Sequence, residues 1–279
     1  DSFASRAVAG MHIDYALTRP VIVYLNGVYY GIYDLNEDQN KDYLVNHYGV
    51  DGDLVDIIQR NVTVLQGSNA DIKRVFAFAV EEDLSDDAVF QQFAEWVDVA
   101  YFTDYFIAQT YFCNSDMFNQ KYWRSQDYTV KWRPIFYDLD FVFNVPSGYK
   151  RDIIPNYFSK TGVPSNDGSL TYMNIYVGLN KNAAWRQMCA ERYVELVCTQ
   201  FAPERLLAIL DELVEAMRPE MERHIARWNR PKSMSAWEEA VEKLREMIRN
   251  RPQYALDNMQ AYFKISDAQM DEWIAKHSA

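Results

Sequence analysis

The hydrophobic pattern changes once along this chain of 279 residues, near residue 86. Before that point, β-branched and aromatic residues stand in short runs that end at turn residues, which is typical of strands. After it, apolar residues recur every three or four positions, which is the spacing of helices with one buried face. We therefore predict an α+β protein, with a strand-rich part over residues 1–85 and a mainly helical part over residues 86–279.

The clearest strand signal lies at residues 20–35, where two β-rich runs flank Asn26-Gly27. Both central residues of a type I′ turn need a positive φ, which Asn and Gly tolerate best, so this segment predicts a β-hairpin. The same half of the chain is predicted to contain three further short elements, which are strands at 55–60 and 62–67 and a helix at 41–49.

The helical half begins with an apolar stripe that predicts one long buried helix over residues 86–112. Asp104 falls within the stripe, and we expect it to pair with a cation, because an unpaired buried carboxylate is costly. Pro219 is expected to break or kink a later helix. The remaining predictions are a polar loop at 113–119, strands at 120–124 and 130–137, a long loop at 144–170, and helix starts with a capping box at Ser235 and Ser266.

Composition excludes some classes of partner. The net charge is −12, so the sequence predicts no grip on nucleic acid, which needs clustered Lys and Arg. The longest strongly apolar stretch, residues 21–33, is shorter than the roughly 18 residues that a membrane-spanning helix needs. We therefore expect neither a nucleic-acid partner nor a membrane span in this sequence.

Five polar residues stand where the chain order would bring them together. Asn114, Asp116 and Asn119 follow the predicted buried helix, and two strands then return the chain to Asp138 and Asp140. Residues two apart share one face of a strand, so the last two carboxylates would point the same way. Carboxylate and amide oxygens are the ligands that Mg²⁺ or Mn²⁺ prefers over zinc. This cluster is the candidate chemical site.

The sequence order leaves more than one interpretation open. A protein kinase presents its catalytic base and metal ligands in the same order, which favours phosphoryl transfer. A metal-dependent hydrolase, or a transferase of another nucleotide-derived group, would use a similar carboxylate cluster. The residues also fit an ordinary turn after a helix and the end of a strand.

Four segments of the chain carry a family resemblance. They are RPVIVYLNGVYYGIYDLNED at 19–38, NSDMFNQKYWRS at 114–125, KWRPIFYDLDFVFN at 131–144 and PEMERHIARW at 219–228. Together they resemble the CotH (spore coat protein H) kinase family. The resemblance implies a two-lobed atypical protein-kinase-like fold, in one domain over residues 1–279, with further N-terminal residues in the full protein. It also implies transfer of the γ-phosphate of ATP to Ser or Thr hydroxyls of a surface or coat protein.

The resemblance assigns roles to individual residues. Asp116 would be the catalytic aspartate that accepts the proton of the attacking hydroxyl, and Asp138, Asp140 and Asn119 would hold Mg²⁺ or Mn²⁺. In the related pattern an asparagine often follows the aspartate by five positions. Asn119 follows Asp116 by three, so Asn114 and Gln120 are alternative amide ligands.

The cation that binds the ATP phosphates is harder to identify. Residues 1–119 contain no glycine-rich phosphate loop and few basic residues, and Arg60, at the end of a predicted strand, is our candidate. Glu37 follows the first hairpin, where it could pair with a cation near the nucleotide. The weak cation signal motivates an alternative, a catalytically inactive binding or structural module. The resemblance implies an extracytoplasmic, cell-surface or spore-coat location.

Overall fold

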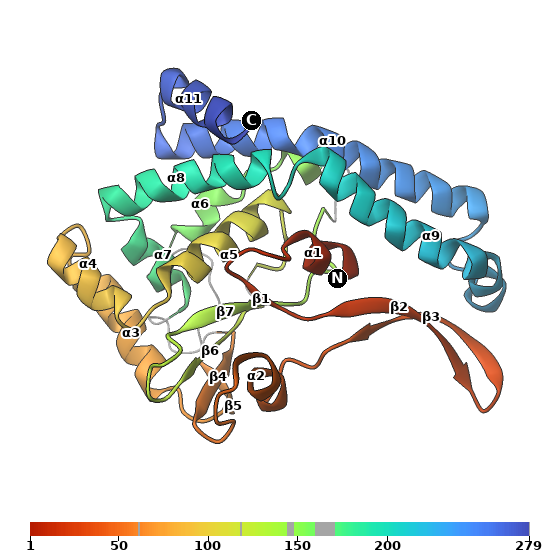
Figure 1. Cartoon of the computed structure of the whole chain (residues 1–279), viewed down its shortest axis with the longest axis horizontal. Coiled ribbons are helices and arrows are strands. Elements are labelled where there is room, and N and C mark those ends of the chain that lie inside the picture. The colour runs from red at the N-terminus through yellow and green to blue at the C-terminus, as the bar shows by residue number, and fades with distance from the viewer. Residues whose placement is uncertain (61, 118, 144–147, 160–170, 279) are drawn as a thin grey trace.

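The computed structural model describes residues 1–60, 62–117, 119–143, 148–159 and 171–278. In this part of the chain, helices surround a five-stranded sheet, and a two-stranded ribbon extends away from it (Figure 1). The predicted α+β class is confirmed. None of the described helices is both long enough and apolar enough to cross a membrane.

The five-stranded sheet has the order β1-β7-β6-β4-β5. β1 and β7 are parallel and the other neighbours are antiparallel, so β4-β5 and β6-β7 form the two predicted strand pairs. Strands from both sides of residue 86 share this one sheet, while the two-lobed division stays a prediction. The strands are β1 Asp14–Tyr15, β4 Val55–Gln59, β5 Thr63–Gln66, β6 Lys121–Ser125 and β7 Arg133–Phe136.

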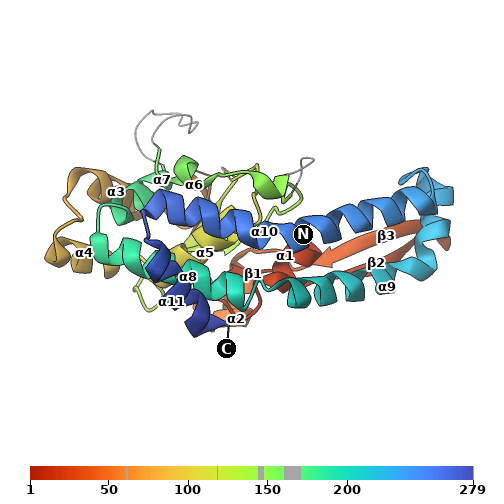
Figure 2. The ribbon, with the colours of Figure 1, turned by 90° about the horizontal axis from the view of Figure 1, so that it is seen from above.

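The ribbon is the predicted hairpin, formed by β2 Thr18–Leu25 and β3 Val28–Asn36. Asn26 and Gly27 have φ values of 51° and 77°, as the turn requires. The ribbon lies along helix α9, Pro203–Trp228, in both views (Figures 1 and 2).

Side chains of α9 hydrogen-bond to the backbone of β3. The Ile32 N–H donates to His224 Nδ1 at 3.0 Å, and Trp228 Nε1 donates to the Tyr30 carbonyl at 2.6 Å. This close approach needs Gly31, because a Cβ there would lie 2.8 Å from Trp228 Nε1. The ribbon is therefore fixed to the helical part by specific contacts.

Helix α5, Val99–Tyr111, lies at the centre of the core, and residues 102–111 are all buried. It packs against β7, α8 and α10, so it is the element that relates the sheet to the C-terminal helices. The other helices are α1 Ser2–Ala7, α2 Lys41–Tyr48, α3 Ala70–Glu81, α4 Asp87–Ala94, η1 Gly148–Lys150, α6 Ile154–Tyr157, α7 Met173–Leu179, α8 Ala183–Cys198, α10 Met234–Phe263 and α11 Asp267–His277.

The prediction of one helix over residues 86–112 is wrong, because the chain leaves the helix between α4 and α5. There the Asp98 N–H donates to the Trp132 carbonyl, and the Trp132 N–H donates to the Trp96 carbonyl, each at 2.9 Å. Asp98 then caps α5 by accepting a hydrogen bond from the Tyr101 N–H. Pairing with the segment before β7 therefore replaces one turn of helix.

The predicted break at Pro219 is wrong, since α9 runs through this residue to Trp228, and the alternative of a kink there stays a prediction. Proline removes one backbone donor, and packing against α10 and the ribbon keeps the helix continuous. The capping box at Ser266 is confirmed, whereas α10 is capped by Ser233 and not by Ser235. Of the predicted loop at 144–170, residues 144–147 and 160–170 lie outside the described residues, and the rest contains η1 and α6.

Asp104 is paired as predicted. Arg192 on α8 donates from Nε and Nη2 to the two carboxylate oxygens of Asp104, at 3.0 and 2.9 Å. Such a two-point contact holds α8 against α5 with the geometry that favours arginine at buried carboxylates.

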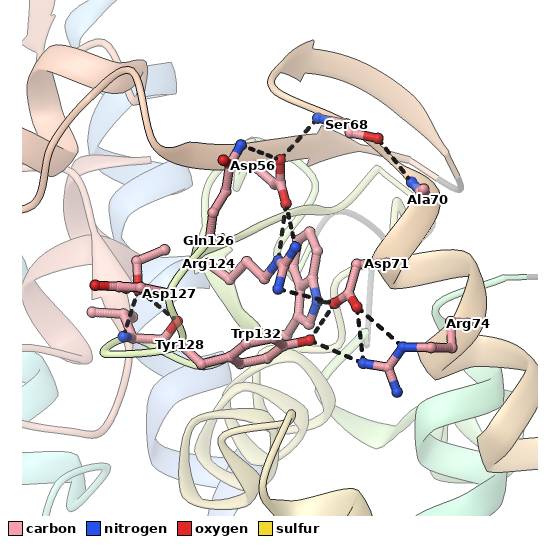
Figure 3. Close-up of polar contacts among 12 residues, drawn as sticks. Asp56, Ser68, Ala70, Asp71, Arg74, Arg124, Gln126, Asp127, Tyr128 and Trp132 are labelled. Atoms are coloured by element: carbon pink, nitrogen blue, oxygen red, sulfur yellow. Dashed lines mark hydrogen bonds and ion pairs between the residues drawn. The ribbon is translucent and has the colours of Figure 1, made fainter.

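A network of charged side chains ties α3 to the sheet (Figure 3). The Arg124 guanidinium on β6 lies between two carboxylates, at 2.8 Å from Asp56 on β4 and 3.3 Å from Asp71 on α3. Tyr128 and Trp132 donate hydrogen bonds to Asp71 as well. Burial alone would raise the pKa of Asp71, but these donors and the nearby arginines hold its pKa below the ordinary value.

We expect Arg124→Met to lower the free energy of unfolding by about 3–5 kcal/mol, because it leaves the buried Asp56 carboxylate without its cation. The double variant Arg124→Met/Asp56→Asn should recover part of this loss, because it also removes the unpaired buried charge of Asp56. Urea denaturation at pH 7 measures both, with the surface variant Arg218→Met as the control. If Arg124→Met lowers the free energy of unfolding no more than Arg218→Met does, Arg124 is not the cation that stabilises the buried Asp56 carboxylate.

Candidate functional site

The loop that follows α5 is hydrogen-bonded to the loop that follows β7. The Phe143 N–H donates to the Phe112 carbonyl at 3.0 Å, and the Ser115 N–H donates to the Phe141 carbonyl at 3.4 Å. The first loop carries Asp116 and the second carries Asp138 and Asp140. The buried helix and the returning β6-β7 hairpin therefore bring the predicted acidic residues to one place.

The route by which Asp138 and Asp140 come together differs from the prediction. Asp138 has a φ of 56°, so the strand ends before it and the two residues do not share a strand face. Asp140 is exposed and Asp138 is half-buried, and the two carboxyl groups lie close enough for Asp140 to act on the pKa of Asp138.

Several causes raise the pKa of Asp138. Burial is the largest, and the hydrogen bond with Asp140 and the negative charges of Asp140 and Asp116 add to it. The Asn119 amide, which donates to Asp138, acts in the opposite direction. Three carboxylates close enough to interact by charge form a place where a cation would be stabilised.

Asn119 is held in a defined orientation beside Asp138. Its amide Nδ2 donates to Asp138, and its Oδ1 accepts a hydrogen bond from the Tyr137 hydroxyl at 2.7 Å. Gln59 Nε2 donates to the same Tyr137 oxygen at 2.8 Å. The amide oxygen therefore points away from the carboxylates and reaches them only if the amide group turns over.

The side chains at this place have the chemistry of ligands for a hard divalent cation. Asp138, Asp140 and Asn119 offer only oxygen ligands, which suit Mg²⁺ or Mn²⁺. In the described part of the chain, no group of three or more His, Cys, Asp or Glu side chains is gathered tightly enough to hold a metal. A metal here would be bound by the two carboxylates and the turned amide, with water or substrate oxygens completing its shell.

The two alternative amide residues have other roles in the structure. Asn114 is buried, and its Oδ1 accepts from the Asp116 N–H at 3.0 Å, so it shapes the loop that presents Asp116. Gln120 is buried and donates to the Met117 carbonyl at 3.1 Å. Neither side chain hydrogen-bonds to Asp138, whereas Asn119 does.

A cavity of about 330 Å³ opens beside Asp138, at the base of the ribbon. Glu37 lines it, with its carboxylate bonded to the Leu17 N–H at 2.7 Å and to His47 Nε2 at 2.9 Å. Arg60 is not among the residues that line it, although its charge lies near enough to Tyr137 to affect the pKa of that hydroxyl. The predicted nucleotide roles of Arg60 and Glu37 remain predictions.

Lys121, the first residue of β6, also lines the cavity, and the sequence reasoning missed it. Kinase lysines that bind phosphate precede the catalytic loop, so the sequence points to basic residues before that loop, whereas Lys121 follows it. One signal was available in the sequence: Lys121 stands two residues after Asn119, between the candidate loop and a predicted strand.

A comparison with protein families identifies the class to which this arrangement belongs. The model described as CotH kinase protein matches residues 1–255. The chain therefore belongs to the CotH kinase family, and this membership indicates a kinase-like function. No curated protein gives a significant match.

Arg251 on α10 holds the end of α5 in place. It is 1% exposed, and it donates to the Thr110 and Tyr111 carbonyls at 2.7 Å. It also donates to the Tyr149 and Arg151 carbonyls, at 2.7 and 3.1 Å. One buried guanidinium thus joins the helix before the Asp116 loop to the segment at 149–151, and the carbonyl dipoles at the helix end stabilise its charge.

We expect Arg251→Gln to lower the free energy of unfolding by about 3 kcal/mol, because several buried carbonyls lose a charged donor.

The same variant should make the Cys113 thiol react faster with a thiol reagent in native buffer. This thiol donates to the Arg151 carbonyl, and burial raises its pKa. The control is Arg249→Gln on the same helix, 51% exposed. Equal labelling of Cys113 in both variants would show that Arg251 does not hold this junction.

Proposed function

We propose that this protein is a metal-dependent kinase that transfers the γ-phosphate of ATP to Ser or Thr hydroxyls of a surface or coat protein. Membership of the CotH kinase family supports phosphoryl transfer in general. The observation that carries the specific proposal is the meeting of Asp116, Asp138 and Asn119 beside a cavity, through hydrogen-bonded loops. The two-lobed kinase-like arrangement belongs to the same proposal.

Asp116 is proposed as the base. Asn114 fixes its backbone, and its charge is close enough to Asp138 to influence that carboxylate. In the reaction, Asp116 orients the acceptor hydroxyl and accepts its proton as the hydroxyl oxygen bonds to the γ-phosphorus and ADP leaves. Correct placement of the hydroxyl supplies much of the rate in such transfers.

Asp138, Asp140 and Asn119 are proposed to hold Mg²⁺ or Mn²⁺. When bound, the ion neutralises charge on the phosphate oxygens. Tyr137 and Gln59 support this role from the protein side, because both donate to Asn119 Oδ1 and so fix Asn119 next to Asp138. The Tyr137 hydroxyl oxygen can also accept from the amide nitrogen when the amide turns over. The cavity beside Asp138 is the proposed place for ATP, with Glu37 in its wall.

Two observations favour a second candidate, a catalytically inactive module that binds through the same cavity. The oxygen of Asn119 points at Tyr137, and the described carboxylates do not gather into a three-member metal cluster. Such a module would bind its partner without transferring phosphate.

Transfer of ³²P from γ-labelled ATP, with Mn²⁺ or Mg²⁺ and a Ser-rich acidic acceptor, tests the proposal. We expect Asp116→Ala and Asp138→Ala to lose activity by at least about 100-fold, as loss of a positioned base or metal ligand predicts. Loop carboxylates contribute little to the core, so both variants should keep the wild-type melting temperature within a few degrees.

The control is Asp53→Asn, a surface carboxylate that is 83% exposed and distant in sequence from both loops. It should transfer phosphate at the wild-type rate. If the wild type binds ATP and metal without any transfer, the inactive module is the correct candidate. Full activity in the Asp138 variant would exclude the proposed metal site.

A further inference from the structure

Lys121 is an unusual residue in the wall of the cavity. Carboxylates of Glu37, Asp38 and Asp138 line the same space, and Lys121 is the one basic side chain among the described residues that do so. The lysine is only 9% exposed. Burying a charged ammonium this deeply costs desolvation energy. A hydrogen-bonding or oppositely charged partner is needed to offset that cost.

The protein itself supplies little of that compensation. The ammonium donates one hydrogen bond, to the Gln39 carbonyl at 3.3 Å, and lies 4.7 Å from the centre of the Tyr137 ring. The described residues give it no ion pair within bonding distance. The ammonium therefore has donors left for a ligand in the cavity.

We infer that Lys121 binds the phosphate tail of a nucleoside triphosphate in this cavity, and that its fixed charge takes the place of a second divalent ion. An ammonium in a partly dry site forms strong hydrogen bonds to phosphate oxygens. The inference rests on the proposed function, because it takes ATP as the ligand and Asp138 as the metal ligand. It adds the residue that recognises the phosphates.

The position of Lys121 in the sequence supports the inference that its charge takes the place of a second divalent ion. In protein kinases the residue five positions after the catalytic aspartate is an asparagine that holds a second metal ion. The fifth residue after Asp116 is Lys121, and β6 directs it to the cavity that Asp138 also lines. A positive side chain at that place would repel a second cation, so this site takes one metal ion for each nucleotide.

Binding measurements test this without relying on catalysis. Isothermal titration calorimetry with Mn²⁺ compares the imido analogue of ATP, AMP and inorganic tripolyphosphate on the wild type, Lys121→Met and Lys121→Arg. We expect Lys121→Met to lower the affinity for the ATP analogue about tenfold or more and the affinity for AMP less than about twofold. This is the effect expected from the loss of a charged hydrogen bond to phosphate. Lys121→Arg should restore most of the affinity.

The metal count is measured by electron paramagnetic resonance of free Mn²⁺ in the presence of the ATP analogue. The wild type should bind one Mn²⁺ per nucleotide, and Lys121→Asn should bind two. The matched control is Lys41→Met, a surface lysine paired with Asp53, which should change neither result. Melting temperatures establish that each variant is folded.

The possible failures are distinguishable. If Lys121→Met lowers the affinities for the ATP analogue and AMP equally, or if the wild type binds two Mn²⁺ ions, the role of Lys121 is overturned. The proposed function is not affected by either result. Tripolyphosphate bound as tightly as the ATP analogue would identify a general polyphosphate site and overturn the nucleotide assignment. Mn²⁺ binding that is unchanged in Asp138→Asn would overturn the proposed function on which the inference rests.

Discussion

The two backbone hydrogen bonds that join the loop after α5 to the loop after β7 hold the candidate site residues together. They form because α5 is buried over residues 102–111 and β7 packs against it. Without this contact, Asp116 would lie at the end of a helix and Asp138 at the end of a sheet. With it, the candidate residues Asp116, Asp138, Asp140 and Asn119 come together, and Asp138 lines a cavity.

The site is organised around negative charge that the fold does not neutralise. The charges of Asp116 and Asp140 both act on Asp138, and Lys121 is the one basic side chain among the described residues that line the cavity. Elsewhere the chain treats buried carboxylates differently, since Asp56 and Asp104 each receive an arginine at hydrogen-bonding distance. Burial accounts for the contrast, because Asp56 and Asp104 are almost fully buried, whereas Asp116 and Asp138 are half-buried and Asp140 is exposed to water.

Much of the local structure could be predicted from the sequence. The Asn26-Gly27 hairpin, the β4-β5 pair, the helix before Gly49 and the cation partner of Asp104 follow from short-range chemistry and the cost of a buried charge. The failures occurred where distant segments compete with a local preference. Trp132 takes the backbone groups that would continue a helix through Asp98, and packing keeps α9 continuous through Pro219.

The sequence by itself determined which residues were available for chemistry: Asp116, Asp138, Asp140 and Asn119 follow from residue type, spacing and family resemblance. Only the tertiary structure decided how they meet. The positive φ of Asp138, the orientation of the Asn119 amide and the entry of Lys121 into the cavity depend on contacts between segments that lie far apart in the chain. The physical reason is that local sequence sets backbone preferences over a few residues, whereas burial and hydrogen bonding between distant segments decide where each side chain ends.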